Sequence, residues 1–155
     1  MARRAEKIRN SVKCVFPAKS VNEGLARMIT AAFAAQADPP VSVLAELKTA
    51  VSEAVTNCIV HGYRDREDKG ECPIFFSASL NEKGVLRVVI RDQGSGIPDV
   101  ALARTPLYTT DAGHERSGMG FTVMESFTDK ISVRSKYGKG TTVTMYKKIN
   151  GRAAL

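Results

Sequence analysis

Hydrophobic and polar residues first alternate with a period of two over residues 11–17. Val12, Cys14 and Phe16 occupy one set of positions, and Ser11 and Lys13 lie between them. This period predicts a half-buried strand. Residues 1–10 are highly charged and are expected to form a frayed basic arm ahead of the strand.

The next pattern is helical. Ser20 and Glu23 have the spacing of a capping box, which predicts that a helix begins here. Asp38-Pro-Pro is expected to stop this helix. Its apolar residues, expected on one side, are Leu25, Met28, Ile29, Ala32 and Phe33.

A second, longer helix is predicted from near Ser42 to Gly62, with Gly62 as the C′ residue that ends it. An apolar face is indicated by residues at i, i+4, i+7 and i+11, which are Leu47, Val51, Ala54 and Cys58. Glu53, Asn57 and His61 follow one another at intervals of four and are expected on one side. A carboxylate and an amide one turn apart can bind a metal or place a reacting group; an ordinary solvated face is the alternative.

The remaining pattern predicts two hairpins. Strands are expected at 72–80 and 85–91, and again at 131–136 and 141–148, with a helix at 117–127 before the second pair. Short turns between strands imply antiparallel pairing. We therefore expect an α+β fold: a two-layer α/β sandwich with a mixed, mostly antiparallel sheet and helices on one face. Residues 11–149 would form a single domain, followed by a tail at 150–155.

Composition excludes several classes of protein. The chain has 155 residues, 43% hydrophobic and 25% charged, as in an ordinary globular domain. No apolar run approaches the roughly 20 residues of a membrane span, and no apolar segment follows the basic start, so neither a membrane partner nor a signal peptide is expected. Cys14, Cys58 and Cys72 lack metal-type spacing and indicate reduced thiols of a cytoplasmic protein.

The net charge of +7 is concentrated at the two ends. Residues 1–13 hold five basic residues and one acidic residue, and residues 130–155 hold seven basic and no acidic residues. Such ends can contact nucleic acid or an acidic protein. Because aromatic residues are not interleaved with the basic ones, we expect plain solubility or a protein partner, and no direct binding of nucleic acid.

Two glycine-containing sites are candidates for ligand binding. Asp92-Gln-Gly94-Ser-Gly96 follows a strand, where glycines allow a ligand close to the backbone and Asp92 can accept a hydrogen bond from an amino group. Ser117-Gly118-Met119-Gly120 opens a helix, whose N–H groups and dipole favour an anion. An ordinary turn and an ordinary helix cap are the alternatives. Residues 97–116 between the two sites form an unusually long segment that is expected to be an irregular lid.

These residues together resemble the ATP-binding fold shared by gyrase, Hsp90, histidine kinases and MutL. The resemblance is closer to the sporulation anti-sigma F factors, which are small serine kinases of spore-forming bacteria. It is carried by Ser-Glu-Ala-Val-Thr-Asn at 52–57, His-Gly-Tyr at 61–63, Asp-Gln-Gly-Ser-Gly-Ile-Pro at 92–98, Pro-Leu-Tyr-Thr-Thr at 106–110 and Glu-Arg-Ser-Gly-Met-Gly-Phe at 115–121. It covers residues 11–149.

The resemblance implies a site for ATP or ADP with Mg²⁺. Asn57 would hold the metal through its side-chain oxygen, and Asp92 would accept the adenine amino group. Glu53 would be the general base that deprotonates the attacking serine hydroxyl, and Arg116 would reach the γ-phosphate. The other implied nucleotide contacts are His61, Gly94, Gly96, the lid residues Thr109 and Thr110, the phosphate-binding run Ser117, Gly118, Met119 and Gly120, and, through water, Thr141.

The resemblance also implies protein partners. The chain would sequester a sigma factor and would phosphorylate a serine of an anti-anti-sigma protein. It would form a homodimer through its first strand and first helix. Arg27, expected to be exposed on that helix, matches a partner-contacting arginine of the family; an ordinary solvated residue is the alternative.

Two features depart from the family pattern, and two other functions remain open. The basic arm is longer than expected, and the lid contains Asp111-Ala-Gly-His114 where a Lys-Pro-type sequence is commoner. One alternative is a stress-response anti-sigma kinase that acts on another sigma factor. The other is a non-catalytic binding module that keeps ATP as a structural ligand.

Overall fold

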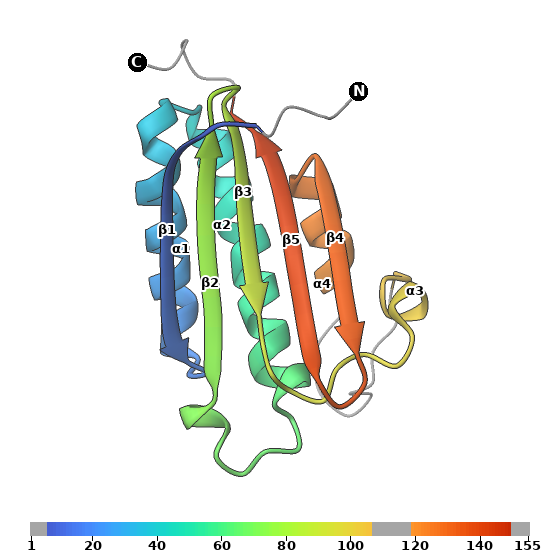
Figure 1. The fold of residues 1–155 in the computed structure, drawn as a ribbon. Helices are drawn as coiled ribbons and strands as arrows, with labels where there is room; N and C mark the ends of the chain where they lie inside the picture. The colour runs from blue at the N-terminus through green and yellow to red at the C-terminus, as the bar shows by residue number, and fades with distance from the viewer. Residues whose placement is uncertain (1–5, 107–118, 150–155) are drawn as a thin grey trace.

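A computed structural model describes residues 6–106 and 119–149. Five strands in these ranges form one sheet with the order β1-β2-β3-β5-β4, and all neighbouring strands are antiparallel (Figure 1). The strands are β1 (Ile8–Pro17), β2 (Pro73–Asn81), β3 (Val85–Arg91), β4 (Lys130–Lys136) and β5 (Gly140–Lys148). Both predicted hairpins are confirmed.

Three helices cover one face of this sheet. They are α1 (Val21–Ala34), α2 (Val41–Asn57) and α4 (Gly120–Phe127), and the opposite face is not covered by any described helix (Figure 1). The predicted two-layer α+β architecture is therefore confirmed. Short 3-10 turns at Ala35–Ala37 and Lys69–Glu71 follow α1 and precede β2.

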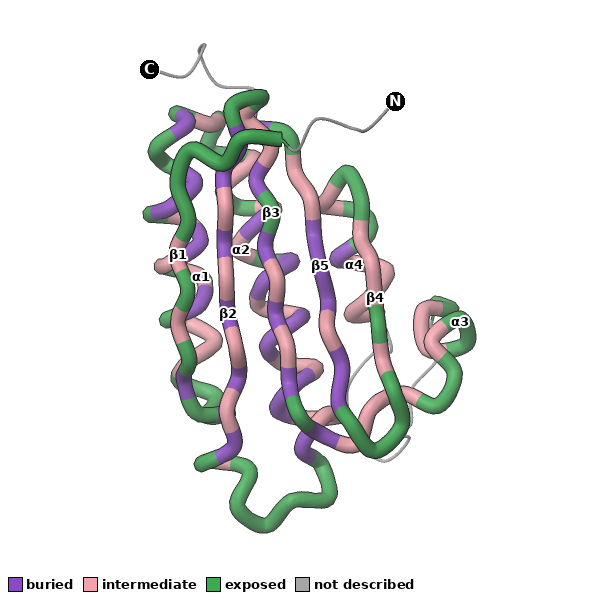
Figure 2. The backbone as a smooth tube through the Cα atoms, in the orientation of Figure 1, coloured by how far each residue is buried: buried purple, intermediate pink, exposed green. Residues whose placement is uncertain are grey.

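The sheet buries alternate residues of each strand against the helices, as a period of two requires. One such row across the sheet is Cys14, Phe76, Ile90 and Val143. Figure 2 shows the resulting alternation of buried and less buried residues along the central strands. The core therefore lies between the sheet and the helical layer.

The first strand begins three residues earlier than predicted, at Ile8, so the expected frayed arm is wrong for residues 6–10. Lys7 O accepts a hydrogen bond from Glu82 N at 3.0 Å, and Asn81 Nδ2 donates to Glu6 Oε2 at 2.6 Å. These contacts with the β2–β3 turn hold the segment in place, and no local sequence pattern signals them.

The predicted capping box is also wrong. Ser20 makes no side-chain cap bond. The Glu23 carboxylate instead accepts a hydrogen bond from Thr56 Oγ1 on α2 at 2.9 Å. The Glu23 side chain therefore binds a residue of α2 instead of the start of its own helix.

The buried side of α1 is not the side that carries most of its larger apolar residues. The buried residues are Ala26, Thr30, Phe33 and Ala34, whereas Leu25 and Met28 are 44% and 67% exposed. Small side chains at 26, 30 and 34 allow α1 to pack closely on α2, which leaves the larger apolar residues outside.

One short helix, α3 (Val100–Ala103), was not predicted. It lies beside β4, within the segment expected to be irregular (Figure 1). Asp99 caps it, since its Oδ1 accepts a hydrogen bond from Leu102 N at 3.0 Å. Arg104 Nε then donates to Glu125 Oε1 of α4 at 2.8 Å, which attaches the start of the segment to the helical layer.

Candidate functional site

The last turns of α2 place Glu53 and Asn57 beside the start of α4. The apolar stripe of α2 is buried, with Leu47, Val51 and Ala54 at most 1% exposed. Glu53 and Asn57 are half-buried at its border. The i, i+4 spacing therefore puts a carboxylate and an amide side by side, as predicted.

Gly120, the first residue of α4, faces both of these side chains. A Cβ atom placed on Gly120 would lie 3.3 Å from Asn57 Oδ1 and 3.4 Å from Glu53 Oε2. The missing side chain thus preserves space in front of the two polar groups. Backbone N–H groups at a helix start have no partner within the helix, so this space combines anion-binding donors with an oxygen ligand and a carboxylate.

The helix does not continue regularly to Gly62, as predicted, but ends in a π turn, Cys58–Gly62. Tyr63 N donates to Cys58 O at 3.0 Å, which is the wider i to i+5 pattern. His61 is half-buried in this turn, so the α-helical spacing that was to align it with Asn57 is wrong beyond Asn57. Single π turns of this kind occur frequently at functional sites.

Gly62 has a different role from the expected helix-ending C′ residue. Its φ is not among the positive values found at other glycines. Instead, a Cβ at this position would lie 2.8 Å from Asp92 Oδ2. The residue is therefore a glycine because Asp92 occupies the adjacent space, which brings the loop after β3 against the end of α2.

Asp92 is the most buried acidic residue of the described chain, with 5% of its surface exposed. Its Oδ1 accepts a hydrogen bond from Gly94 N at 2.9 Å, and its own N–H donates to Thr141 O at 3.0 Å. Burial raises the pKa of the Asp92 carboxyl, and the bond from Gly94 opposes this shift. Burial also raises the pKa of the neighbouring Cys58 thiol, which stays protonated as a donor to Asp92.

The glycines after Asp92 fit the loop against other backbone segments. A Cβ on Gly94 would lie 2.0 Å from Gly62 O. Gly96 has a φ of +74°, and a Cβ there would lie 2.3 Å from Lys136 O. These two positions require glycine for packing within the protein. Their contact with a ligand stays a prediction.

Tyr63 is a positioning residue that sequence reasoning did not assign to the site. The side chain is 1% exposed. Its hydroxyl accepts a hydrogen bond from Gln93 N at 2.8 Å and donates to Pro73 O at 2.5 Å. It thereby fixes the backbone directly after Asp92. The only sequence signal was its place in the His61-Gly-Tyr motif.

Other predicted residues fall into three groups. Thr141 is buried beside Asp92, and its hydroxyl lies 2.8 Å from Ser135 Oγ.

Arg27 is half-buried rather than exposed, because Nη1 donates to Ser52 Oγ on α2 at 2.9 Å. Thr109, Thr110, Arg116, Ser117 and Gly118 lie outside the described residues, whereas Met119 precedes α4 directly.

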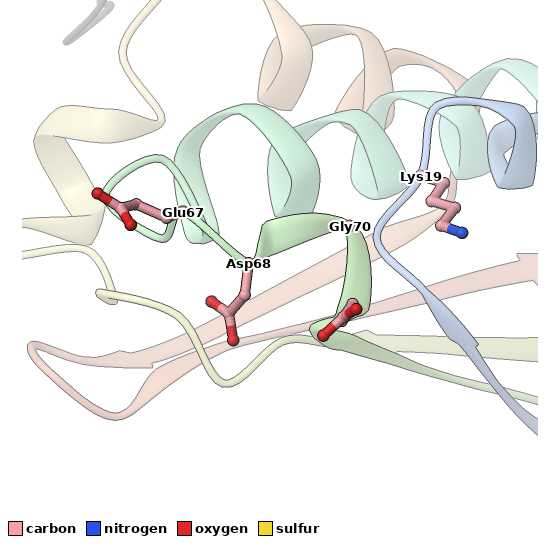
Figure 3. A pocket seen from close by; sticks show the side chains of 5 residues that line it. Lys19, Glu67, Asp68 and Gly70 are labelled. Atoms are coloured by element: carbon pink, nitrogen blue, oxygen red, sulfur yellow. The ribbon is translucent and has the colours of Figure 1, made fainter.

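A surface hollow lies away from this site. Lys19, Glu67, Asp68, Gly70 and Glu71 line it (Figure 3), and none of them is a predicted site residue. Hydrogen bonds from Arg66 lower the pKa of the Asp68 carboxyl. Within residues 6–106 and 119–149, no three His, Cys, Asp or Glu side chains are arranged to hold a metal ion.

Comparison with known proteins agrees with this geometry. The histidine kinase-like ATPase domain family matches residues 16–147. The anti-sigma F factor of Geobacillus kaustophilus is 49% identical over 148 residues, which cover 96% of this chain and 99% of the relative. That of Clostridium novyi is 50% identical over 143 residues, covering 90% and 95%.

The chain belongs to the anti-sigma F factors. This anti-sigma F factor therefore carries an ATP-using, kinase-like domain of the histidine kinase-like ATPase family. In the part of the chain with a described structure, no helix has the length and apolar character of a membrane span.

Solved structures show the same fold at low identity. A structure of RsbU and RsbW domains from Mycobacterium tuberculosis matches with a TM-score of 0.66 at 19% identity, over 90% of this chain and 32% of that chain. Full-length ShkA in complex with AMPPNP matches with a TM-score of 0.57 at 18% identity, over 85% of this chain and 31% of that chain. The anti-sigma F factor thus spans about a third of each of these larger chains.

Proposed function

We propose that this anti-sigma F factor binds Mg-ATP at the end of α2 and transfers the γ-phosphoryl group to a serine of an anti-anti-sigma protein. The observation that carries the proposal is the convergence of Glu53, Asn57, Gly120 and Asp92 around that helix end. Asp92 would accept the adenine amino group, and the backbone at Gly120 would face the phosphates. His61, Gly94, Gly96, Thr141 and the segment with Thr109, Thr110 and Arg116 would complete the site.

Asn57 would hold Mg²⁺. Its amide oxygen is a hard ligand of the type that this cation prefers, and it borders the space that a Cβ on Gly120 would fill, 3.3 Å from that atom's position. When bound, the metal neutralises charge on the phosphates of ATP.

Replacement of Asn57 by alanine should remove the effect of Mg²⁺ on nucleotide affinity. Wild-type protein is expected to bind ATP more tightly with Mg²⁺ than with a chelator, whereas the variant should bind equally under both conditions. Calorimetric titration measures this difference, and Asn22→Ala on α1 is the matched control. A variant that keeps the full Mg²⁺ effect would refute the metal role.

Glu53 would act as the general base. The serine hydroxyl would lose its proton to the Glu53 carboxylate as its oxygen forms a bond to the γ-phosphorus, and the bond between that phosphorus and ADP would break. The geometry supports this role because the carboxylate lies one turn before Asn57 and faces the same space. Positioning and charge neutralisation supply most of the catalysis in such reactions.

The protein would also sequester a sigma factor as a homodimer. Apolar residues left exposed on α1 support a pairing surface there; Val21, Leu25 and Met28 are 76%, 44% and 67% exposed. They follow one another at i, i+4 and i+7 and form one stripe. Strand β1 lies at the edge of the sheet next to α1, and its outer side has no neighbouring strand among the described residues.

Arg27 would contact the protein partners from the same helix. Replacing it by alanine should weaken capture of a sporulation sigma factor in the presence of ATP by about tenfold, since a charge at a protein interface is lost. Ser52→Ala is the matched control, because it removes the hydrogen bond from Arg27 but keeps the cation. ATP affinity should not change in either variant.

Two outcomes of this capture experiment would count against the partner role. Arg27→Ala could bind the sigma factor as the wild type does. Alternatively, Ser52→Ala could lose as much affinity as Arg27→Ala, which would assign Arg27 to packing between α1 and α2. If the protein captures a stress-response sigma factor in preference to a sporulation sigma factor, the alternative function of a stress-response anti-sigma kinase would be favoured.

A further inference from the structure

The face of the sheet opposite the helices is a second, separate surface. No described helix covers it (Figure 1). The strand register assigns one row across it, Ser79, Arg87, Tyr146 and Lys130, and a second row, Phe75, Arg91, Thr142 and Arg134. We call this surface the open face.

Charge on the open face has a single sign. None of the five strands contains an aspartate or a glutamate. The alternation of strand residues places seven basic side chains on this face: Lys13, Arg87, Arg91, Lys130, Arg134, Lys136 and Lys148. A concentration of one sign of charge produces a field that attracts an anionic partner.

None of these seven cations has a carboxylate partner among the described residues, unlike Lys147 of the same sheet. Lys147 lies on the helix-facing side of β5, and its Nζ pairs with Glu46 Oε2 of α2 at 3.0 Å. By contrast, the ion pairs among the described residues include none of the seven open-face cations. Their charge is therefore available to an external group.

The aromatic residues of the open face disfavour nucleic acid as that partner. The guanidinium of Arg91 lies over the Phe75 ring at 4.0 Å from the centroid, and Lys130 lies over the Tyr146 ring at 5.6 Å. Single-stranded nucleic acid binds such surfaces by stacking bases on free rings, and both rings already carry a cation. A face of five strands, about 19 Å wide, is also broader than the roughly 12 Å major groove of a duplex.

The polar residues between the cations fit carboxylates. Ser77, Ser79 and Thr142 lie partly exposed on the open face beside the basic residues. Hydroxyl groups can donate to carboxylate oxygens, and Arg and Lys form charge-assisted hydrogen bonds with them. We propose that the open face is a docking surface for an acidic segment of a partner protein, distinct from the nucleotide site on the helical side of the sheet.

The test measures binding of a short fluorescent poly-glutamate peptide to the full chain by anisotropy, at low and at physiological salt. Arg87→Glu combined with Lys130→Glu reverses two charges on the open face. The matched control combines Lys48→Glu on α2 with Lys69→Glu in the 3-10 turn before β2, which gives the same change in net charge elsewhere. Peptide affinity should fall by about tenfold or more in the open-face variant and much less in the control.

Equal ATP affinity of both variants and the wild type would show that the fold and the nucleotide site are intact. Equal losses of peptide affinity in the two variants would mean that only net charge matters. No peptide binding by the wild type would show that the open face does not dock acidic segments. Either result overturns the proposal. A mixed-sequence single-stranded oligonucleotide is titrated in parallel. If the wild type binds this oligonucleotide more tightly than the peptide, and the open-face variant loses that binding, the partner of the open face would be nucleic acid and not an acidic protein.

Discussion

Replacing Glu53 by glutamine is expected to reduce phosphoryl transfer to the serine acceptor by about 10²- to 10⁴-fold, the usual contribution of a general base. Glutamine keeps the size of the side chain beside Gly120 and Asn57, but it cannot take the hydroxyl proton. Affinity for Mg-ATP should stay close to that of the wild type. Single-turnover transfer from labelled ATP to an anti-anti-sigma protein measures the first quantity, and calorimetry the second.

The matched control is Glu46→Gln, two turns earlier on the same helix. It removes the ion pair with Lys147 but touches neither Asn57 nor Gly120. Transfer at the wild-type rate by Glu53→Gln would refute the base assignment. A wild-type protein that binds ATP and a sigma factor but transfers no phosphoryl group would favour the non-catalytic binding module.

Replacing Asp92 by alanine is expected to weaken ATP binding by about 10- to 100-fold, because a hydrogen bond to a buried charged group is lost. The effect should depend on the base. Wild-type protein should prefer ATP to inosine triphosphate, which carries an oxygen in place of the adenine amino group, and the variant should bind both equally. Competition binding measures this preference, with Asp129→Ala at the start of β4 as control. Retained discrimination in Asp92→Ala would place the adenine elsewhere.

The raised pKa of Asp92 adds a pH dependence of opposite sign for binding and for folding. Burial favours the protonated carboxyl, so acidification protonates Asp92 at a higher pH than a free aspartate. ATP affinity should therefore fall as the pH falls through this raised value. The contribution of Asp92 to the free energy of unfolding has the opposite dependence. Because its pKa is higher in the folded than in the unfolded state, this contribution is largest at low pH and is lost as the pH rises through the folded-state pKa.

Local patterns were sufficient for the elements whose stability depends on nearby residues. The period of two predicted all five strands, and β3 begins and ends at the expected residues, Val85 and Arg91. The apolar stripe of α2 was predicted correctly, since Leu47, Val51 and Ala54 are all buried. The chemistry at Glu53, Asn57 and Asp92 was visible as motifs, although their meeting was implied only by the family resemblance.

Contacts between distant segments decided the features that the sequence alone did not predict. The side of α1 that is buried depends on how closely Ala26 and Ala34 let the helix approach α2, and not on which residues are most hydrophobic. Glu23 binds Thr56 rather than the helix start, because α2 brings a hydroxyl within reach. The buried side of a helix and the partner of a polar side chain depend on residues far away in the chain, so local sequence rules cannot predict them.

The sequence by itself determined the order and type of the five strands and of the helices α1, α2 and α4, the antiparallel hairpins and the family of the chain. Only the tertiary structure decided that Gly62 is needed to make room for Asp92, that Tyr63 holds the loop after it, and that basic residues from four strands gather on one uncovered face. The physical reason is the same in each case. Propensity and periodicity act between neighbours in the chain, whereas close packing and the summed field of charges act between neighbours in space.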